Sequence, residues 1–123
     1  MENFLFLLGL STILVHEMDA VRLAEWRILL GFLRLSDEMG YLVFTALHLP
    51  LYLLLFWFLF DTTTTPASLN SALIRGLDGF FILHVGLHWA FRNHRHYQFT
   101  SLFSKLLIGI PGLCGALDLA LRK

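Results

Sequence analysis

Residues 40–60 read GYLVFTALHLPLYLLLFWFLF, and this stretch decides the class of fold. It contains no Asp, Glu, Lys or Arg. An α-helix needs about 20 apolar residues, at about 1.5 Å each, to cross the roughly 30 Å hydrocarbon core of a bilayer. Of the 123 residues in the chain, 57% are hydrophobic and only 15% are charged, whereas about a quarter are charged in a soluble domain. The sequence therefore predicts a protein whose solvent is lipid.

Three further apolar stretches of similar length flank this one, at residues 3–23, 69–91 and 102–121. The polar residues are concentrated in the connections between the stretches, and these connections are short. Short connections join neighbouring antiparallel helices. The sequence thus predicts a single all-α domain over residues 1–123, an integral membrane four-helix antiparallel bundle with spans at about 3–23, 40–60, 69–91 and 102–121.

The basic residues predict how the bundle is oriented. Most of them lie at the ends of the spans that are joined by the first and third connections: Arg22, Arg27, Arg34, Arg92, Arg95 and Lys105. Basic residues accumulate on the cytoplasmic side of membrane proteins. We therefore expect connections one and three in the cytoplasm and both termini on the other side. The net charge of zero gives no indication of a nucleic-acid partner.

Several ionisable side chains lie inside the apolar stretches, where each costs a few kcal/mol unless it has a partner or a function. Three of them are histidines in three different spans, His16, His48 and His84. Each is about seven or eight residues from the cytoplasmic end of its span, which places all three roughly 10–12 Å below the same membrane face. The three imidazoles are therefore expected to share one layer of the bundle.

Further metal-ligand side chains point toward the same layer. Asp19 follows His16 by three residues and His88 follows His84 by four, so each pair occupies one face of its helix. Imidazoles and carboxylates projecting inward from facing helices are typical of metal sites in helix bundles. The sequence predicts a divalent metal, zinc or iron, bound by His16, Asp19, His48, His84 and His88.

Two glutamates close to this layer suggest catalysis. Glu17 or Glu25 would act as the general base on a metal-bound water, because a cation lowers the pKa of that water toward neutrality. A site inside the bilayer favours a lipid-like substrate, which would enter sideways or from the cytoplasmic leaflet. The hypothesis is a membrane metalloenzyme with hydrolase or oxidase-type chemistry, surrounded by membrane lipid and able to form a homo-oligomer.

Other functions are compatible with the same residues. A b-type haem or electron-transfer protein would use two facing histidines, such as His48 and His84, as axial ligands. A proton, ion or metal carrier, or an accessory subunit of a membrane complex, would need no catalysis. A purely structural interpretation has His48 bonding a carbonyl freed by Pro50, and Arg75 pairing with Asp78 or with Asp118.

Several short motifs resemble an uncharacterised family of small four-span membrane proteins of bacteria, cyanobacteria among them. Its signature is His-Glu-x-Asp-Ala followed by Glu-Trp-Arg, found here at residues 16–20 and 25–27. Asp37-Glu38, His48-x-Pro50 and residues 78–89 also resemble the family. The resemblance implies a bacterial inner membrane or a thylakoid membrane, and it implies no activity.

Overall fold

The computed structural model describes residues 3–61 and 63–122, and every regular element in these two ranges is helical. The prediction of an all-α chain is therefore confirmed. In chain order the elements are α1 (Phe4–Arg22), α2 (Trp26–Leu29), the short 3-10 helix η1 (Gly31–Leu33), α3 (Asp37–Phe60), α4 (Ala67–Phe91) and α5 (Leu102–Leu121).

Serine caps fix where two of the long helices begin. The Ser36 hydroxyl accepts a hydrogen bond from the backbone N–H of Met39 at 3.3 Å, so α3 starts before the apolar stretch itself. Asp37 follows in the first turn, where a negative charge interacts favourably with the helix dipole. Ser101 caps α5 in the same way by accepting from the N–H of Ser104 at 3.0 Å. Both caps satisfy N–H groups that a helix leaves without intrahelical partners.

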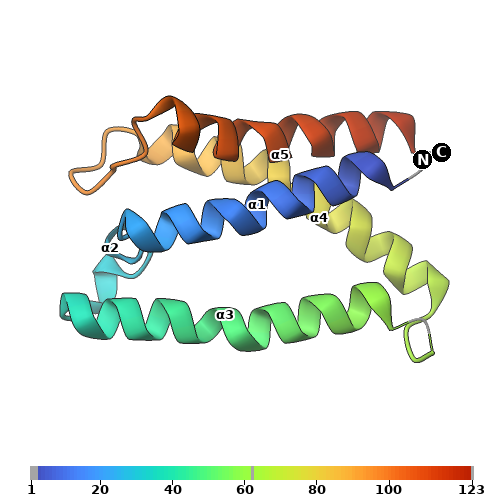
Figure 1. Cartoon of the computed structure of the whole chain (residues 1–123), viewed down its shortest axis with the longest axis horizontal. Coiled ribbons are helices and arrows are strands. Elements are labelled where there is room, and N and C mark those ends of the chain that lie inside the picture. Colours follow the sequence, from blue (N-terminus) through green and yellow to red (C-terminus); the bar gives the residue numbers. More distant parts are fainter. Residues whose placement is uncertain (1–2, 62, 123) are drawn as a thin grey trace.

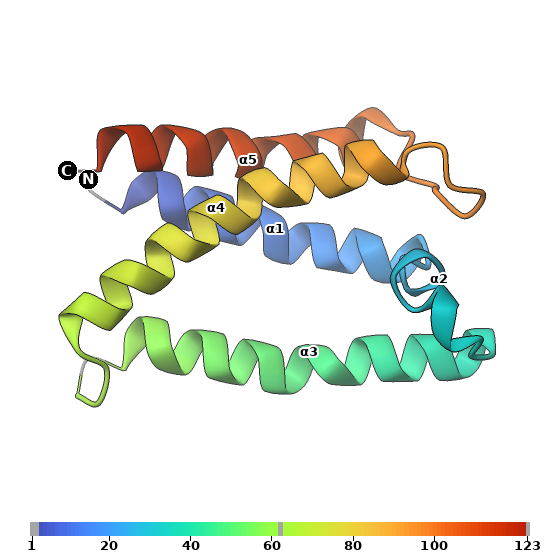
Figure 2. The same cartoon turned by 180° about the vertical axis from the view of Figure 1, so that it is seen from behind.

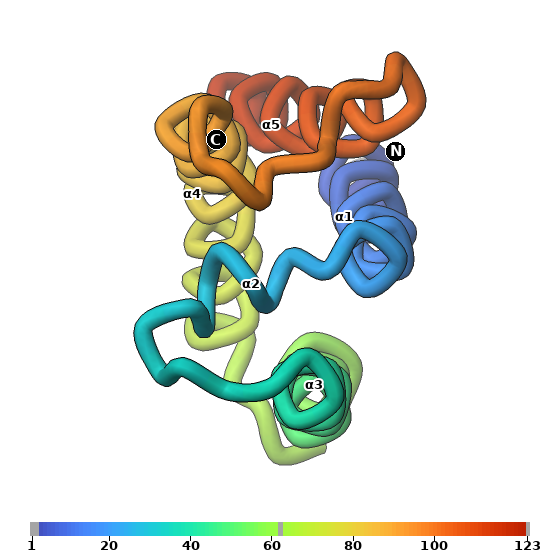
Figure 3. Tube along the Cα trace, turned by 90° about the vertical axis from the view of Figure 1, so that its left-hand side faces the viewer, coloured from blue at the N-terminus to red at the C-terminus, as the bar shows by residue number. Residues whose placement is uncertain are grey.

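Three of the long helices pack closely and the fourth stands apart. Helix α5 packs along both α1 and α4 and makes the most extensive helix contacts. Helix α3 contacts α4 at one end of the molecule and α2 at the other, and it is separated from α5 (Figures 1 and 2). The view along the long axis shows the chain running from the end of α1 through α2, in front of α4, before it returns to α3 (Figure 3).

Within the described residues, three helices are long and apolar enough to cross a membrane, namely α1, α3 and α5. Helix α4 is equally long, but its apolar character is lowered by Arg75, Asp78, His84 and His88. Most of the Leu and Phe side chains of α3 are exposed. Such a surface is unfavourable in water and suits lipid, so these helices indicate a membrane location.

Two apolar clusters enclose the region where the buried histidines meet. One cluster includes Ile13 and Phe81 and lies toward the chain termini. The other includes Ala20, Phe44 and Phe99. His16 lies on α1 between Ile13 and Ala20, so the first helix passes from one cluster to the other at this histidine.

Candidate metal site

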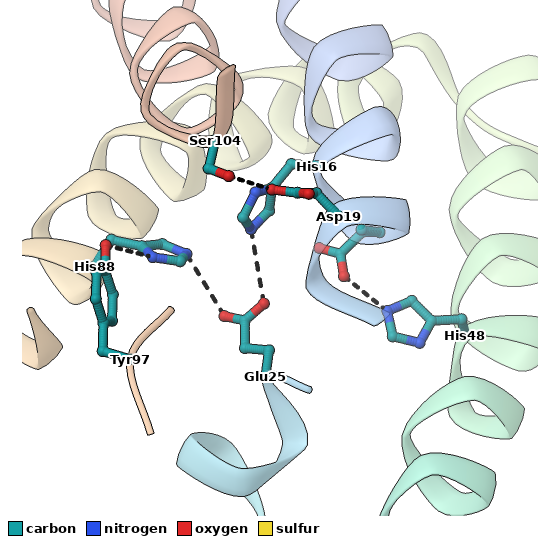
Figure 4. A network of polar contacts seen from close by, with 8 residues as sticks. His16, Asp19, Glu25, His48, His88, Tyr97 and Ser104 are labelled. Carbon is teal, nitrogen blue, oxygen red and sulfur yellow. Dashed lines mark hydrogen bonds and ion pairs between the residues drawn. The ribbon is translucent and has the colours of Figure 1, made fainter. Parts of the chain in front are cut away.

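Four buried side chains with metal-ligand atoms converge between α1, α2 and α4. They are His16, Glu25, His84 and His88, and one ligand atom from each lies within 4.8 Å of all the others. His16 is on α1, Glu25 precedes α2, and His84 and His88 are on α4. Figure 4 shows how the side chains of His16, Glu25 and His88 point toward one another. This convergence of three imidazoles and a carboxylate can hold a metal ion.

The three imidazoles come together because α1 and α4 both pack along α5 and so lie next to each other. His84 and His88 are four residues apart and therefore lie on one face of α4, the buried one. The ring centroid of His16 is 4.7 Å from that of His84 and 5.0 Å from that of His88. The centroids of the two α4 rings are 4.6 Å apart. Each ring thus contacts both others, with edges directed at faces.

Glu25 reaches the histidines because the chain reverses immediately after α1. Ala24 adopts a left-handed conformation with φ of 55°, which is uncommon for a residue other than glycine. The N–H of Glu25 then bonds to the carbonyl of Ala20 at 3.0 Å. This turn directs the carboxylate back toward the bundle, where Oε2 lies 3.7 Å from His16 Nε2 and Oε1 lies 3.5 Å from His88 Nε2.

Several nitrogen atoms of the group have no hydrogen-bond partner among the described residues. They are both nitrogens of His16, Nδ1 of His84 and Nε2 of His88. Leaving a buried polar group without a partner costs about 1–3 kcal/mol. Neutral imidazole nitrogens are also good ligands for zinc and iron. The atoms that lack partners are therefore the ones a metal ion would use.

Tyr97 supports His88 from the side away from the group. Its hydroxyl oxygen lies 3.3 Å from His88 Nδ1. Burial raises the pKa of the Tyr97 phenol, and the negative charge of Glu25 raises it further, so the phenol stays neutral. If the His88 Nδ1–H donates to Tyr97, Nε2 carries the lone pair and faces Glu25. Such outer hydrogen bonds fix the orientation of metal-binding imidazoles.

Asp19, which the sequence placed among the ligands, lies outside this group. One of its oxygens accepts hydrogen bonds from the Arg22 guanidinium at 2.8 and 3.0 Å. The other accepts from the Ser104 hydroxyl at 2.6 Å. Both oxygens are therefore engaged, and the residue joins α1 to α5. The sequence did not indicate that Ser104 contacts Asp19, because only the packing of α5 on α1 brings the two residues together.

His48 and Glu17 pair with each other instead of joining the three histidines. His48 Nε2 lies 3.0 Å from Glu17 Oε2, and its Nδ1 lies 2.7 Å from the carbonyl oxygen of Phe44. The carbonyl that Pro50 leaves without its helical N–H is that of Ala46, four residues earlier. His48 therefore does not compensate for the proline, which corrects the structural interpretation of this residue.

A cavity of about 190 Å³ connects the pair to the histidine group. Its polar lining includes Glu17 and His48 on one side and Glu25, His84 and His88 on the other. The two glutamates proposed as bases from the sequence thus take different positions. Glu25 belongs to the ligand group, whereas Glu17 faces that group across the cavity.

A family model described as a family of unknown function (DUF6713) matches residues 2–123 of the chain. No curated protein and no solved structure matches it.

Proposed function

The chain belongs to a family of unknown function (DUF6713), and we propose from its buried His/Glu group that it is an integral membrane metalloprotein. The observation that carries the proposal is the convergence of ligand atoms from His16, Glu25, His84 and His88 within 4.8 Å. In this proposal α1, α3, α4 and α5 all cross a bacterial membrane, and the site lies near its cytoplasmic face.

The donor set favours zinc or iron over magnesium or calcium, because three of the four ligands are imidazoles. Tetrahedral zinc with bonds of about 2.0–2.1 Å brings its ligand atoms to about 3.3 Å from one another. The ligand atoms here lie up to 4.8 Å apart. Metal binding in this proposal requires the side chains to rotate and close that difference. The haem alternative used two facing histidines, such as His48 and His84. The nitrogens of His48 are engaged by Glu17 and Phe44, and we therefore propose a metal ion.

An apolar groove between α1 and α3 supports the proposal that the substrate is lipid-like. Its volume is about 420 Å³ and its lining is Leu14, Glu17, Met18, Val21, Thr45, His48, Tyr52 and Phe56. Glu17 and His48 also line the cavity beside the histidine group. The groove and that cavity therefore share one polar wall. An amphiphile with its apolar chain in the groove would present its polar end to this wall and to the site beyond it.

The position of Glu17 fits a general base in a metal-dependent enzyme of the hydrolase or oxidase type. Its carboxylate faces the cavity but is outside the ligand group, so it remains available for proton transfer. Its partner His48, whose Nε2 lies 3.0 Å from Glu17 Oε2, orients the Glu17 carboxylate. In the proposed reaction the pair holds the substrate's polar end and removes a proton from the attacking group.

Metal analysis of purified variants tests this proposal. Wild-type protein reconstituted with zinc or with iron is expected to retain stoichiometric metal after desalting, and His84→Ala is expected to lose it. His48→Ala and His94→Ala should retain the metal, because His48 pairs with Glu17 and His94 lies in the loop after α4. A wild-type protein without bound metal contradicts the proposal. Loss of metal in His48→Ala would return that residue to the ligand set.

A further inference from the structure

A second buried polar site lies in α4 at Asp78, between Ile74 and Phe81 of the first apolar cluster. The Asp78 side chain is completely buried, and neither of its oxygens has a hydrogen-bond partner in the described structure. His84 is six residues further along α4, a rise of roughly 9 Å. Buried Phe81 lies between them on the same helix face. Asp78 therefore belongs to a site of its own.

Helix α5 approaches the backbone of α4 very closely at Asp78. A Cβ atom placed on Gly115 would lie 2.5 Å from the carbonyl oxygen of Asp78, so only glycine allows the two backbones to come so close. Asp118 follows Gly115 by three residues on the same face of α5. It is also buried, and it is the carboxyl that faces Asp78. Two carboxyl groups from different helices thus share one apolar interior.

Within residues 3–61 and 63–122, a cation pairs with only one of these two carboxyls. The Arg122 guanidinium donates to Asp118 through Nε at 3.0 Å and Nη2 at 2.5 Å, and both hydrogen bonds end on Oδ2. Asp118 Oδ1 therefore remains available to accept another hydrogen bond. Arg75, which the sequence suggested as a partner, is exposed and forms no ion pair with either carboxyl in the described structure. The Cys114 thiol of α5 is a further titratable neighbour of both carboxyls.

The balance of charge requires a proton in this site. Two ionised carboxylates and one guanidinium would leave one negative charge buried without a partner, which is strongly unfavourable in an apolar interior. Carboxyl groups that face each other lower this energy by sharing a proton. Since Asp118 keeps the guanidinium, the proton belongs on Asp78, where it also satisfies an oxygen that otherwise lacks a partner.

We propose that Asp78 and Asp118 form a proton-binding carboxyl pair in which Asp78 carries the proton at neutral pH and donates it to Asp118 Oδ1. Arg122 connects the pair to the end of the molecule where both termini lie (Figure 1). The proton therefore exchanges with the face opposite the histidine group. The chain then has two polar sites, one for a metal ion and one for a proton, with apolar packing between them.

Infrared spectroscopy of the intact protein at pH 7 tests the pair. The wild type is expected to show the C=O stretching band of a protonated carboxyl, shifted in D2O, and Asp78→Asn is expected to lose it. Asp61→Asn is the matched control. Hydrogen bonds from Thr63 and Thr64 lower the pKa of the half-buried Asp61, which is therefore ionised at this pH. Its replacement should leave the band unchanged.

Asp118→Asn provides a second variant. It keeps a hydrogen-bond acceptor opposite Asp78 but removes the charge, so the band should persist at a shifted frequency. Absence of the band from the wild type would overturn the proposal, as would its persistence in Asp78→Asn. Asparagine has the shape of a neutral carboxyl group, and we expect Asp78→Asn to fold with nearly unchanged thermal stability. A strongly destabilised Asp78→Asn would indicate an ionised Asp78 and would also contradict the proposal.

Discussion

Replacing Gly115 by alanine is expected to lower the free energy of unfolding by about 3 kcal/mol, the upper part of the usual range for overpacking. The new methyl group would lie 2.5 Å from the carbonyl oxygen of Asp78 and 3.1 Å from its carbonyl carbon and Cα. These are backbone atoms, so the clash cannot be relieved by rotating a side chain. Helices α4 and α5 would have to separate along their extensive contact.

Two other glycines of α5 provide matched controls. A Cβ added to Gly109 would meet no heavy atom within 4 Å, so Gly109→Ala should leave stability unchanged or raise it through helix propensity. At Gly112 the new Cβ meets a side-chain methyl of Val85 at 2.5 Å, and that side chain can rotate. We expect Gly112→Ala to be intermediate. Unfolding in denaturant, followed by circular dichroism, measures the stability of all three variants. Equal losses of stability in Gly115→Ala and Gly109→Ala would contradict the close packing at Gly115.

The class of fold was predictable because it depends on composition along the chain. Stretches of about 20 apolar residues can satisfy their backbone groups in lipid only as helices, whatever the order of their side chains. The arrangement of the helices was harder to predict from the sequence. The position of α3, away from α5 and in contact with α4 and α2 mainly at its ends, depends on side-chain packing that hydrophobic patterns do not specify.

The candidate site was predictable to the extent that depth in the membrane determines it. Equal distances from the helix ends indicated that His16 and His84 share one layer, and the structure brings these two rings together. Depth does not give the rotation of a helix about its axis or its distance from its neighbours. His48 lies in an equivalent layer by this measure, yet it faces Glu17.

The contribution of Glu25 to the ligand group depends on a backbone conformation that could not be predicted from the sequence. Its carboxylate turns toward His16 because Ala24 is left-handed, a conformation usually associated with glycine or asparagine. Arg122 was also not predicted as the partner of Asp118. The sequence suggested Arg75 because it is only three residues from Asp78. Arg122 follows Asp118 by four residues and therefore lies on the same helix face as Asp118.

Zinc at about 1,000 times its Kd is expected to raise the free energy of unfolding of the wild type by about 4 kcal/mol, because the ion binds the folded chain and not the unfolded one. His16→Ala should abolish this gain. His16 is completely buried, both its nitrogens lack hydrogen-bond partners, and its ring contacts those of His84 and His88. Truncation therefore removes the ligand that joins α1 to the two histidines of α4.

The same titration separates a metal site from simple helix packing. Truncating His16 lowers the stability of the metal-free protein in either case, because it leaves a cavity. Only a metal site makes wild-type stability rise with zinc concentration, and only then is the rise lost in His16→Ala and kept in His94→Ala, which alters the loop after α4. Unfolding midpoints measured across a series of zinc concentrations in all three proteins distinguish the two cases. If the buried histidines serve only to pack α1 against α4, the three proteins will show no zinc-dependent rise.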